Sequence, residues 1–173
     1  MTEELFDAFY RGTVRRLTRY AFGLAGDAVE AQDLVQEAYA RAWQRWRQVS
    51  AYDDGEAWLR LVVNRLVKDR WRRLRIRRAA LASAAPPRPI PPPSEETVLL
   101  VAAMRRLPFE QRQVLLLHHL MDRSLADIAD ETGTNLNTVK TRLTRGRAAL
   151  AALLADQRPA QTARRRGTHV NGA

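Results

Sequence analysis

The side chains of this sequence that could do chemistry are cationic and hydroxyl groups along a predicted helix, which is capped by Asn135 or Asn137 and runs to about Leu154. The helical repeat places five of them on or beside one face: Lys140, Thr141, Arg142, Thr144 and Arg145. Short and cationic hydrogen-bond donors of this kind suit the base edges and phosphates of duplex DNA. No acidic residue occurs from Thr132 to Ala155, as a surface that lies against DNA requires. The pattern predicts DNA binding.

A short helix ahead of this one is predicted to hold it in place. Ser124 stands three residues before Asp127, which is the spacing of a capping box. Gly133 supplies a turn residue that accepts a positive φ, and Ala129 leaves room for two helices to cross closely. These features predict a helix-turn-helix. The alternative is an ordinary helical hairpin with a solvated basic face.

Two surfaces of opposite charge are predicted in the first half of the chain. One is a polar, mainly acidic stripe opposite the apolar side of a helix, made of Asp33, Gln36, Glu37 and Gln44. Composition alone favours a solvated face for this stripe, with docking of a basic partner as the alternative. The other is the segment 65–78, where eight basic residues accompany one acid, Asp69. That concentration suits a nucleic-acid backbone.

Aromatic residues near the basic segment offer surfaces on which unpaired bases can stack. All four tryptophans lie in this half of the chain, at positions 43, 46, 58 and 71. Their helical spacing favours packing for Trp43 and Trp58. Tyr52, in the polar segment 48–55, remains open between packing and stacking.

Apolar residues recur at spacings of three and four along most of the chain, which predicts an all-α fold. A first helix around 6–22 breaks at Gly23 to Gly26, and further helices are expected over about 27–47, 57–71, 98–107, 110–121, 124–131 and 135–154.

Proline divides these helices into two groups. Six of the eight prolines lie between Ala79 and Ser94, where neither a helix nor a sheet ladder can persist. This favours a linker between two small domains over a long surface loop. The predicted organisation is an N-terminal helical domain over 1–78, a Pro-rich linker over 79–94, a helix-turn-helix domain over 95–155 and a basic disordered tail over 156–173.

The composition restricts the classes of function. A net charge of +10 and a pI near 11.2 favour nucleic acid as the partner, followed by an anionic membrane surface. No apolar run is long enough to span a bilayer and the first residues lack a signal-peptide pattern, so a cytoplasmic protein without membrane insertion is expected. The lack of cysteine excludes disulfides and thiolate metal sites. No metal or other cofactor is expected.

A nucleic-acid enzyme is the least supported class. The sequence has no metal-binding pattern of carboxylates and no glycine loop that cradles phosphate. His118 and His119 are neighbours on a predicted helix, where adjacent side chains point in different directions. No catalytic residue is predicted.

In the order of its motifs the chain resembles an alternative sigma factor of bacterial RNA polymerase. The resemblance is to the extracytoplasmic-function (ECF) type of the sigma-70 family, as found in actinobacteria. The matching segments are DLVQE at 33–37 followed by AY and Trp43, AWLR at 57–60 with Asn64 and DR at 69–70, LP at 107–108, QRQVL at 111–115, DIA at 127–129 and TVKTRL at 138–143. The resemblance covers both domains, roughly 1–76 and 94–155. Asp127 departs from it, because the family usually has glutamate there.

The resemblance implies a function and assigns the site residues. Asp33, Gln36 and Glu37 would bind core RNA polymerase at the clamp helices of its largest subunit, which replaces the solvated-face interpretation. Four residues would engage the melted promoter element about 10 base pairs upstream of the start: Tyr52, Asn64, Lys68 and Arg72. The residues around 140–145 would read the duplex element about 35 base pairs upstream. An anti-sigma factor is a possible further partner, and an autonomous helix-turn-helix regulator is the alternative function.

Overall fold

The computed structural model describes residues 2–80 and 94–167, and every regular element in these two ranges is a helix. The helices are α1 (Thr2–Ala25), α2 (Ala28–Gln44), α3 (Trp46–Val49), α4 (Gly55–Ala80), α5 (Glu95–Arg105), α6 (Phe109–His119), α7 (Leu125–Thr132) and α8 (Leu136–Gly167). The predicted all-α fold is confirmed.

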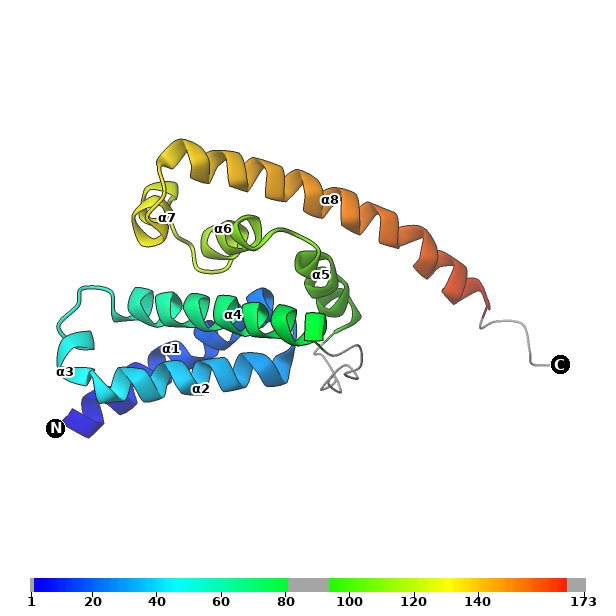
Figure 1. Cartoon of the computed structure of the whole chain (residues 1–173). Helices are drawn as coiled ribbons and strands as arrows, with labels where there is room; N and C mark the ends of the chain where they lie inside the picture. Colours follow the sequence, from blue (N-terminus) through cyan, green and yellow to red (C-terminus); the bar gives the residue numbers. More distant parts are fainter. Residues whose placement is uncertain (1, 81–93, 168–173) are drawn as a thin grey trace.

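The N-terminal half is built on α1, α2 and α4, which pack on one another (Figure 1). On α1 the side chains of Leu17, Tyr20 and Leu24 recur at spacings of three and four, so they share one face and are fully buried. Gly26, at φ 79°, turns the chain after α1. Asp27 then caps α2 as its spacing predicts, because its carboxylate accepts the Glu30 N–H at 2.8 Å.

The connection from α2 to α4 differs from the sequence prediction. The second helix is expected to reach Arg47, whereas α2 ends at Gln44 and the one-turn helix α3 follows. The break lets Trp46 and Val49 turn into the core, where they are 9% and 1% exposed. Asp54 then caps α4 by accepting the Ala57 N–H at 2.8 Å. Burial of two apolar side chains therefore decides the path of a segment whose sequence is mostly polar.

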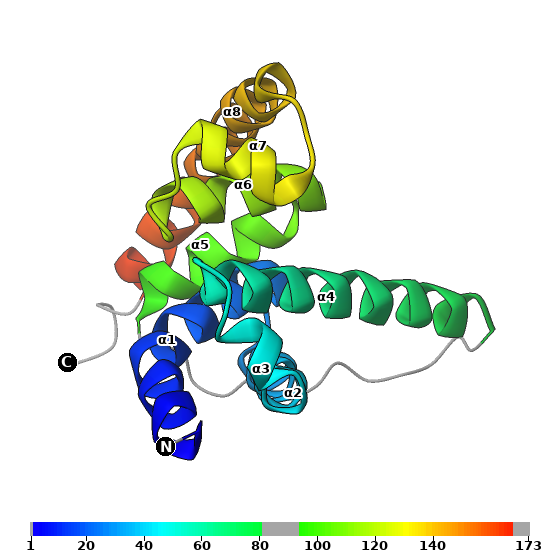
Figure 2. The same cartoon turned by 90° about the vertical axis from the view of Figure 1, so that its left-hand side faces the viewer.

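The C-terminal half contains α5 to α8, which lie above α1, α2 and α4 in Figure 2. Ser94 caps α5 by accepting the Thr97 N–H at 3.2 Å, and Pro108 separates α5 from α6. The helix α8 packs on α5 and α6. It approaches α6 closely at Gly146, where an added Cβ would lie 3.1 Å from a methyl carbon of Leu115.

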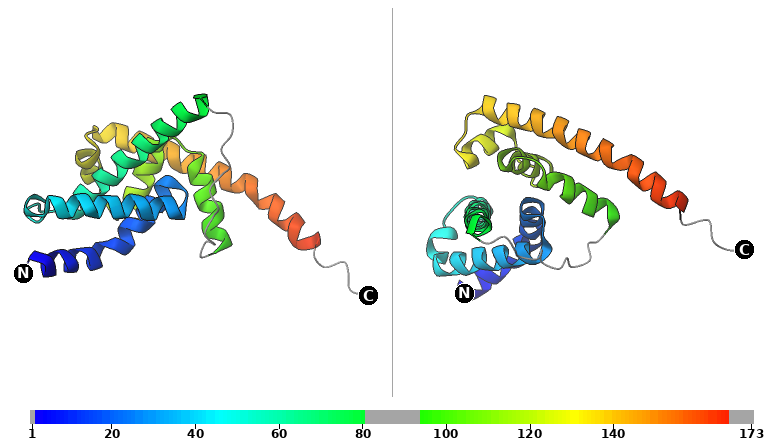
Figure 3. Two further views of the ribbon diagram at one scale, coloured as in Figure 1. Left: turned by 60° about the horizontal axis from the view of Figure 1, so that its bottom comes forward. Right: turned by 45° about the vertical axis from the view of Figure 1, so that its right-hand side comes forward.

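The two halves pack directly on each other, as Figure 3 shows from two further sides. The helix α1 contacts both α5 and α6, and one hydrophobic cluster takes in buried residues of both halves, among them Leu24 and Leu117. At Gly23 the backbone of α1 lies against the Leu116 side chain of α6, since an added Cβ there would come within 2.6 Å of Leu116 Cδ2. Sequence periodicity predicts each half separately and gives no sign of this contact.

The last helix is longer than predicted. The sequence pattern predicts an end near Leu154 and a disordered tail from 156, but α8 continues to Gly167. Alanine, glutamine and arginine, which favour helices, make up most of residues 155–166 and outweigh the single Pro159. Positions 81–93 of the predicted linker and positions 168–173 of the tail lie outside the described residues. Among the described helices, none has the length and apolar character needed to cross a membrane.

Candidate nucleic-acid interface

The helix-turn-helix predicted from sequence is formed by α7 and the start of α8. Ser124 and Asp127 make a complete capping box, in which each side chain accepts the other residue's backbone N–H at 3.1 Å. These hydrogen bonds hold the pKa of the Asp127 carboxyl below its usual value. Gly133 ends α7 at φ 62°, and Asn135 starts α8 by accepting the Thr138 N–H at 2.8 Å. The orientation of α8 is thus fixed by local hydrogen bonds at both sides of the turn.

The cationic side of α8 faces solvent. Val139 and Leu143 point inward and are buried, and Ile128 of α7 is buried with them in the same cluster. Four of the five predicted residues of this surface are exposed: Lys140, Thr141, Thr144 and Arg145. The fifth, Arg142, is half-buried and its Nη1 donates to Thr134 Oγ1 at 3.5 Å. A helix with this exposed face fits the major groove of duplex DNA.

A second cationic surface lies on α4 and the loop before it. Tyr52, Lys68 and Arg72 are exposed, as a contact with nucleic acid requires. The Lys68 ammonium already has partners in the C-terminal half, because it lies 3.8 Å from Glu110 Oε1 and 4.6 Å from the ring centre of Phe109. The described ion pairs, hydrogen bonds and ring contacts therefore join Lys68 to the C-terminal half, but they do not join Tyr52 or Arg72 to it.

Asn64, the fourth residue predicted for this surface, lies inside the protein. It is 6% exposed, and its Oδ1 accepts a hydrogen bond from the Tyr20 hydroxyl at 2.9 Å. Burial raises the pKa of Tyr20, and the nearby Glu131 carboxylate acts in the same direction. In this conformation Asn64 anchors α4 to α1.

Replacing Tyr20 with phenylalanine should lower the free energy of unfolding by about 1–2 kcal/mol, because it leaves the buried Asn64 amide without its donor. Urea denaturation measures this loss. The matched control is Tyr52→Phe, which removes the same hydroxyl from an exposed side chain and should leave the urea midpoint unchanged. Equal midpoints for the two variants would contradict a stabilising role for the Tyr20–Asn64 bond.

The acidic stripe on α2 faces solvent along its length. Asp33 lies 3.9 Å from Arg70 and Glu37 lies 2.8 Å from Arg41, and Gln36 is exposed beside them. Exposed ion pairs of this kind contribute little to stability. The stripe is therefore available to a partner without loss of the fold.

Arg60 is a central residue of the fold that the sequence pattern does not single out. Its guanidinium is 2% exposed and bonds Glu131 with two hydrogen bonds of 2.8 and 2.9 Å. Asp54 and Glu56 lie 3.4 and 3.9 Å away. Burial lowers the pKa of Arg60, but the hydrogen bonds and charge of Glu131 together with the charges of Asp54 and Glu56 outweigh it, and the net direction is upward. The spacing of Glu56 and Arg60, one helical turn apart, is the only part of this cluster that sequence could have signalled.

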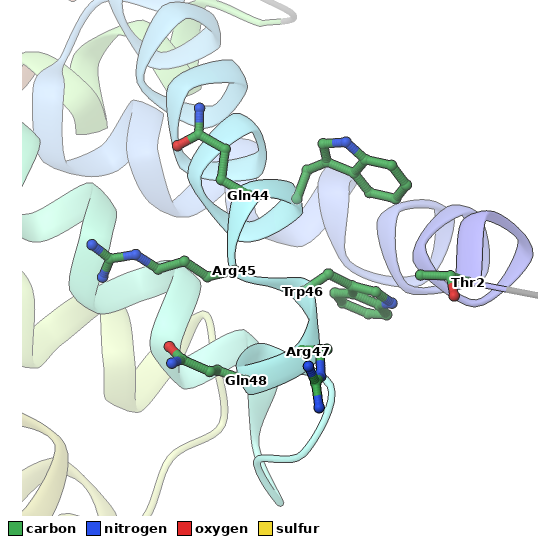
Figure 4. A pocket seen from close by; sticks show the side chains of 7 residues that line it. Thr2, Gln44, Arg45, Trp46, Arg47 and Gln48 are labelled. Carbon is green, nitrogen blue, oxygen red and sulfur yellow. The ribbon is translucent and has the colours of Figure 1, made fainter.

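Aromatic rings gather where α1 meets the end of α2. Phe6 contacts Trp43 and Trp46 with ring centres 4.9 and 5.1 Å apart. Figure 4 shows Trp46 directed towards the start of α1, with Arg45 on the other side, beside a hollow of about 650 Å³. The spacing of Trp43 predicts packing, and its ring contacts Phe6, but 44% of its surface is exposed, so it packs only in part.

The comparison with known proteins agrees with this arrangement. Two family models match the chain, Sigma-70 region 2 over residues 9–77 and Sigma-70, region 4 over residues 97–150. The ECF RNA polymerase sigma factor SigL of Mycobacterium tuberculosis is 32% identical over 146 residues, which are 80% of this chain and 82% of SigL. The chain belongs to the ECF sigma factors of the sigma-70 family.

Other relatives of this sigma factor differ in length. EcfG of Rhodopseudomonas palustris is 30% identical over 158 residues, covering 89% of this chain and 87% of EcfG. The probable sigma factor RfaY of Xanthomonas campestris is 31% identical over 144 residues, and the chain spans only 36% of its length. The fold is shared with RpoE of Bartonella quintana in its complex with the anti-sigma factor NepR, at a TM-score of 0.71, 23% identity and coverage of 87% and 96%. Region 2 takes in α2 and most of α1 and α4, and region 4 takes in the helix-turn-helix.

Proposed function

We propose that this sigma factor binds bacterial core RNA polymerase and directs it to specific promoters, in the cytoplasm and without a catalytic step of its own. The observation that carries the proposal is the presence of two cationic surfaces on one chain, one in region 2 and one in region 4. A tethered pair of surfaces suits two DNA elements at a fixed separation. When one surface binds its element, the local concentration of the second surface at the other element rises.

The region 4 surface on α8 is assigned to the duplex element about 35 base pairs upstream of the start. Exposed cations and hydroxyls lie on one side of this helix, and Val139 and Leu143 fix the other side in the core. Lysine and arginine can read guanine in the major groove, and threonine can contact either a base edge or a phosphate.

The region 2 surface is assigned to the melted element about 10 base pairs upstream. Tyr52, Lys68 and Arg72 are the exposed members of this set, whereas Asn64 supports α4 from inside. Extruding a base from the duplex costs a few kcal/mol of lost stacking and pairing. An exposed tyrosine beside cations can offset part of that cost by stacking.

The acidic stripe on α2 is assigned to the polymerase. Asp33, Gln36 and Glu37 would contact the clamp helices of its largest subunit. Because the stripe is exposed and of opposite sign to most of the chain, it can bind a basic protein surface while the cationic surfaces bind DNA. An anti-sigma factor is a further possible partner, since RpoE of Bartonella quintana forms a complex with one.

In-vitro transcription tests the proposed function. Added to core polymerase on fragmented genomic DNA of the source bacterium, the chain should produce a discrete set of transcript starts that core polymerase alone does not produce. Sequencing of the transcript ends would then give the promoter elements. If the starts with and without the chain were the same, or if the chain alone bound specific duplexes tightly, the autonomous-regulator alternative would be favoured.

A further inference from the structure

Two asparagines near the start of α8 differ in what their side chains do. The sequence leaves the helix cap open between Asn135 and Asn137, and the structure gives it to Asn135, whose Oδ1 accepts the Thr138 N–H at 2.8 Å. Asn137 is exposed, and none of the hydrogen bonds described for residues 94–167 engages its side-chain amide. The fold therefore uses one of the two amides and leaves the other to a ligand.

Asn137 lies at the centre of the exposed face of α8. Residues four and seven positions apart share a helix face, so Asn137 is aligned with Thr141 and Thr144, and all three are exposed. Val139 points into the core from the opposite side. In Figure 1 the start of α8 lies beside α7, on the side of the molecule away from α1 and α2. A recognition helix enters the major groove with its first residues against the base edges, which places Asn137 among the residues that reach deepest.

The other polar side chains of this face offer only part of what a base edge presents. Lys140 and Arg145 donate hydrogen bonds and accept none, which suits the two acceptors of guanine, O6 and N7. The Thr141 hydroxyl donates to the backbone carbonyl of Asn137 at 2.9 Å, so its oxygen is left to accept. Adenine presents a donor, N6–H, beside an acceptor, N7. A primary amide matches both groups in one plane, and Asn137 carries the only amide at the exposed positions between 136 and 148.

The backbone around Asn137 is fixed by hydrogen bonds within the motif. Gly133 ends α7 at φ 62°, and the Asn135 cap sets the first turn of α8. The bond from Thr141 ties that turn to the next one. A neutral amide held on such a helix adds discrimination between bases without adding charge, because only cations release counterions from the phosphates.

From these observations we propose that Asn137 reads an adenine in the upstream promoter element, with its Oδ1 accepting from adenine N6 and its Nδ2 donating to adenine N7. The proposal rests on the proposed function, because it names a base that the region 4 surface selects. Lys140 and Arg145 bind guanine or phosphate, and Asn137 supplies the contact that requires adenine. Asn137 is thus a specificity-determining residue one turn ahead of Thr141.

Selection from a promoter library that is randomised over the upstream element tests the proposal. Polymerase with the unmodified chain should enrich adenine at one position by about 5- to 150-fold over the other bases, the range of one bidentate contact. With N137A the preference at that position should disappear, while the rest of the selected element stays the same. Because the lost amide is neutral, the salt dependence of binding should not change.

Asn135 provides the matched control, since N135A removes the same amide two residues away. N135A should lower the urea midpoint of the chain, because the Thr138 N–H loses its acceptor, and should keep the preference for adenine. N137A should leave the urea midpoint unchanged, because its side chain is exposed and no described bond is lost. A purely structural role for Asn137 predicts the reverse for N137A: a lower midpoint and an unchanged preference.

A modified base locates the contact at the level of atoms. Replacement of the selected adenine by 7-deazaadenine removes the N7 acceptor and leaves base pairing intact. The complex with the unmodified chain should bind this promoter several-fold more weakly, whereas the N137A complex should bind both promoters equally. Equal losses for the two proteins would overturn the proposal. Enrichment of the same adenine by N137A, or no adenine preference in the unmodified chain, would overturn it as well.

Failure of the proposed function gives a different result. In that case polymerase with the unmodified chain would enrich no upstream element. If the chain alone then selected duplexes, the autonomous-regulator alternative would hold, and the same comparison of N137A with N135A would decide the reading of adenine. Selection of no sequence by either preparation would overturn both proposals.

Discussion

Replacing Asp33 and Glu37 with arginine should abolish co-purification with core RNA polymerase while leaving the fold intact. The double change turns two negative charges into two positive ones at the centre of the proposed docking stripe. Like charges facing each other across an interface cost several kcal/mol, and a loss of about 4 kcal/mol weakens affinity about a thousandfold. The fold should tolerate the change because both side chains are more than half exposed and their ion pairs are surface pairs.

A matched control exists on α1. Glu3 and Asp7 have the same spacing of four residues on a helix, and Asp7 pairs with Arg11 as Glu37 pairs with Arg41. The variant E3R/D7R therefore makes the same change in total charge at a different surface and should still co-purify with polymerase. Retention of the D33R/E37R variant on immobilised polymerase would remove the docking assignment. Loss of both variants would show a general effect of charge instead.

The features that sequence predicted well are local ones. The capping box of Ser124 and Asp127 and the cap of α2 by Asp27 each join residues three positions apart, and the positive φ of Gly133 belongs to a single residue. The exposed face of α8 was also predictable, because the helical repeat that sends Val139 inward sends the cations outward. For the candidate DNA surface of region 4, the helical repeat alone was therefore sufficient.

The features that sequence missed depend on contacts between distant segments. Arg60 is a basic residue on a basic helix, and only the fold brings it to Glu131, 71 positions further on. Arg112 resembles a surface residue in sequence, yet its partner Leu24 lies 88 positions earlier. Asn64 was assigned to DNA from its motif, whereas the structure pairs it with Tyr20. Periodicity assigns a polar residue to the surface by default, so it cannot find polar groups that satisfy each other in the interior.

A sigma factor with two tethered cationic surfaces is expected to bind DNA weakly through either surface alone, because the two contacts strengthen each other only when both promoter elements are bound. Variants of the DNA surfaces are therefore best measured in the complex with polymerase.

Measured in that complex, K140A/R145A should lose affinity for a promoter with an intact upstream element by at least about 30-fold. Each lost base contact costs about 1–3 kcal/mol, and every 1.4 kcal/mol is a factor of ten. The side chains are exposed, so the fold should be unaffected. The matched control is R15A/R19A on α1, which removes two exposed cations from outside both DNA surfaces and should bind as the unmodified chain does.

A promoter with a scrambled upstream element separates base contacts from phosphate contacts. If Lys140 and Arg145 read bases, the double variant and the unmodified chain should bind the scrambled promoter equally, because the lost contacts are absent in both complexes. If they contact phosphates, the loss should persist on the scrambled promoter and the salt dependence should fall by about one unit per residue. Equal binding of the two proteins to the intact promoter would remove Lys140 and Arg145 from promoter recognition, because loss of either a base contact or a phosphate contact must weaken binding there.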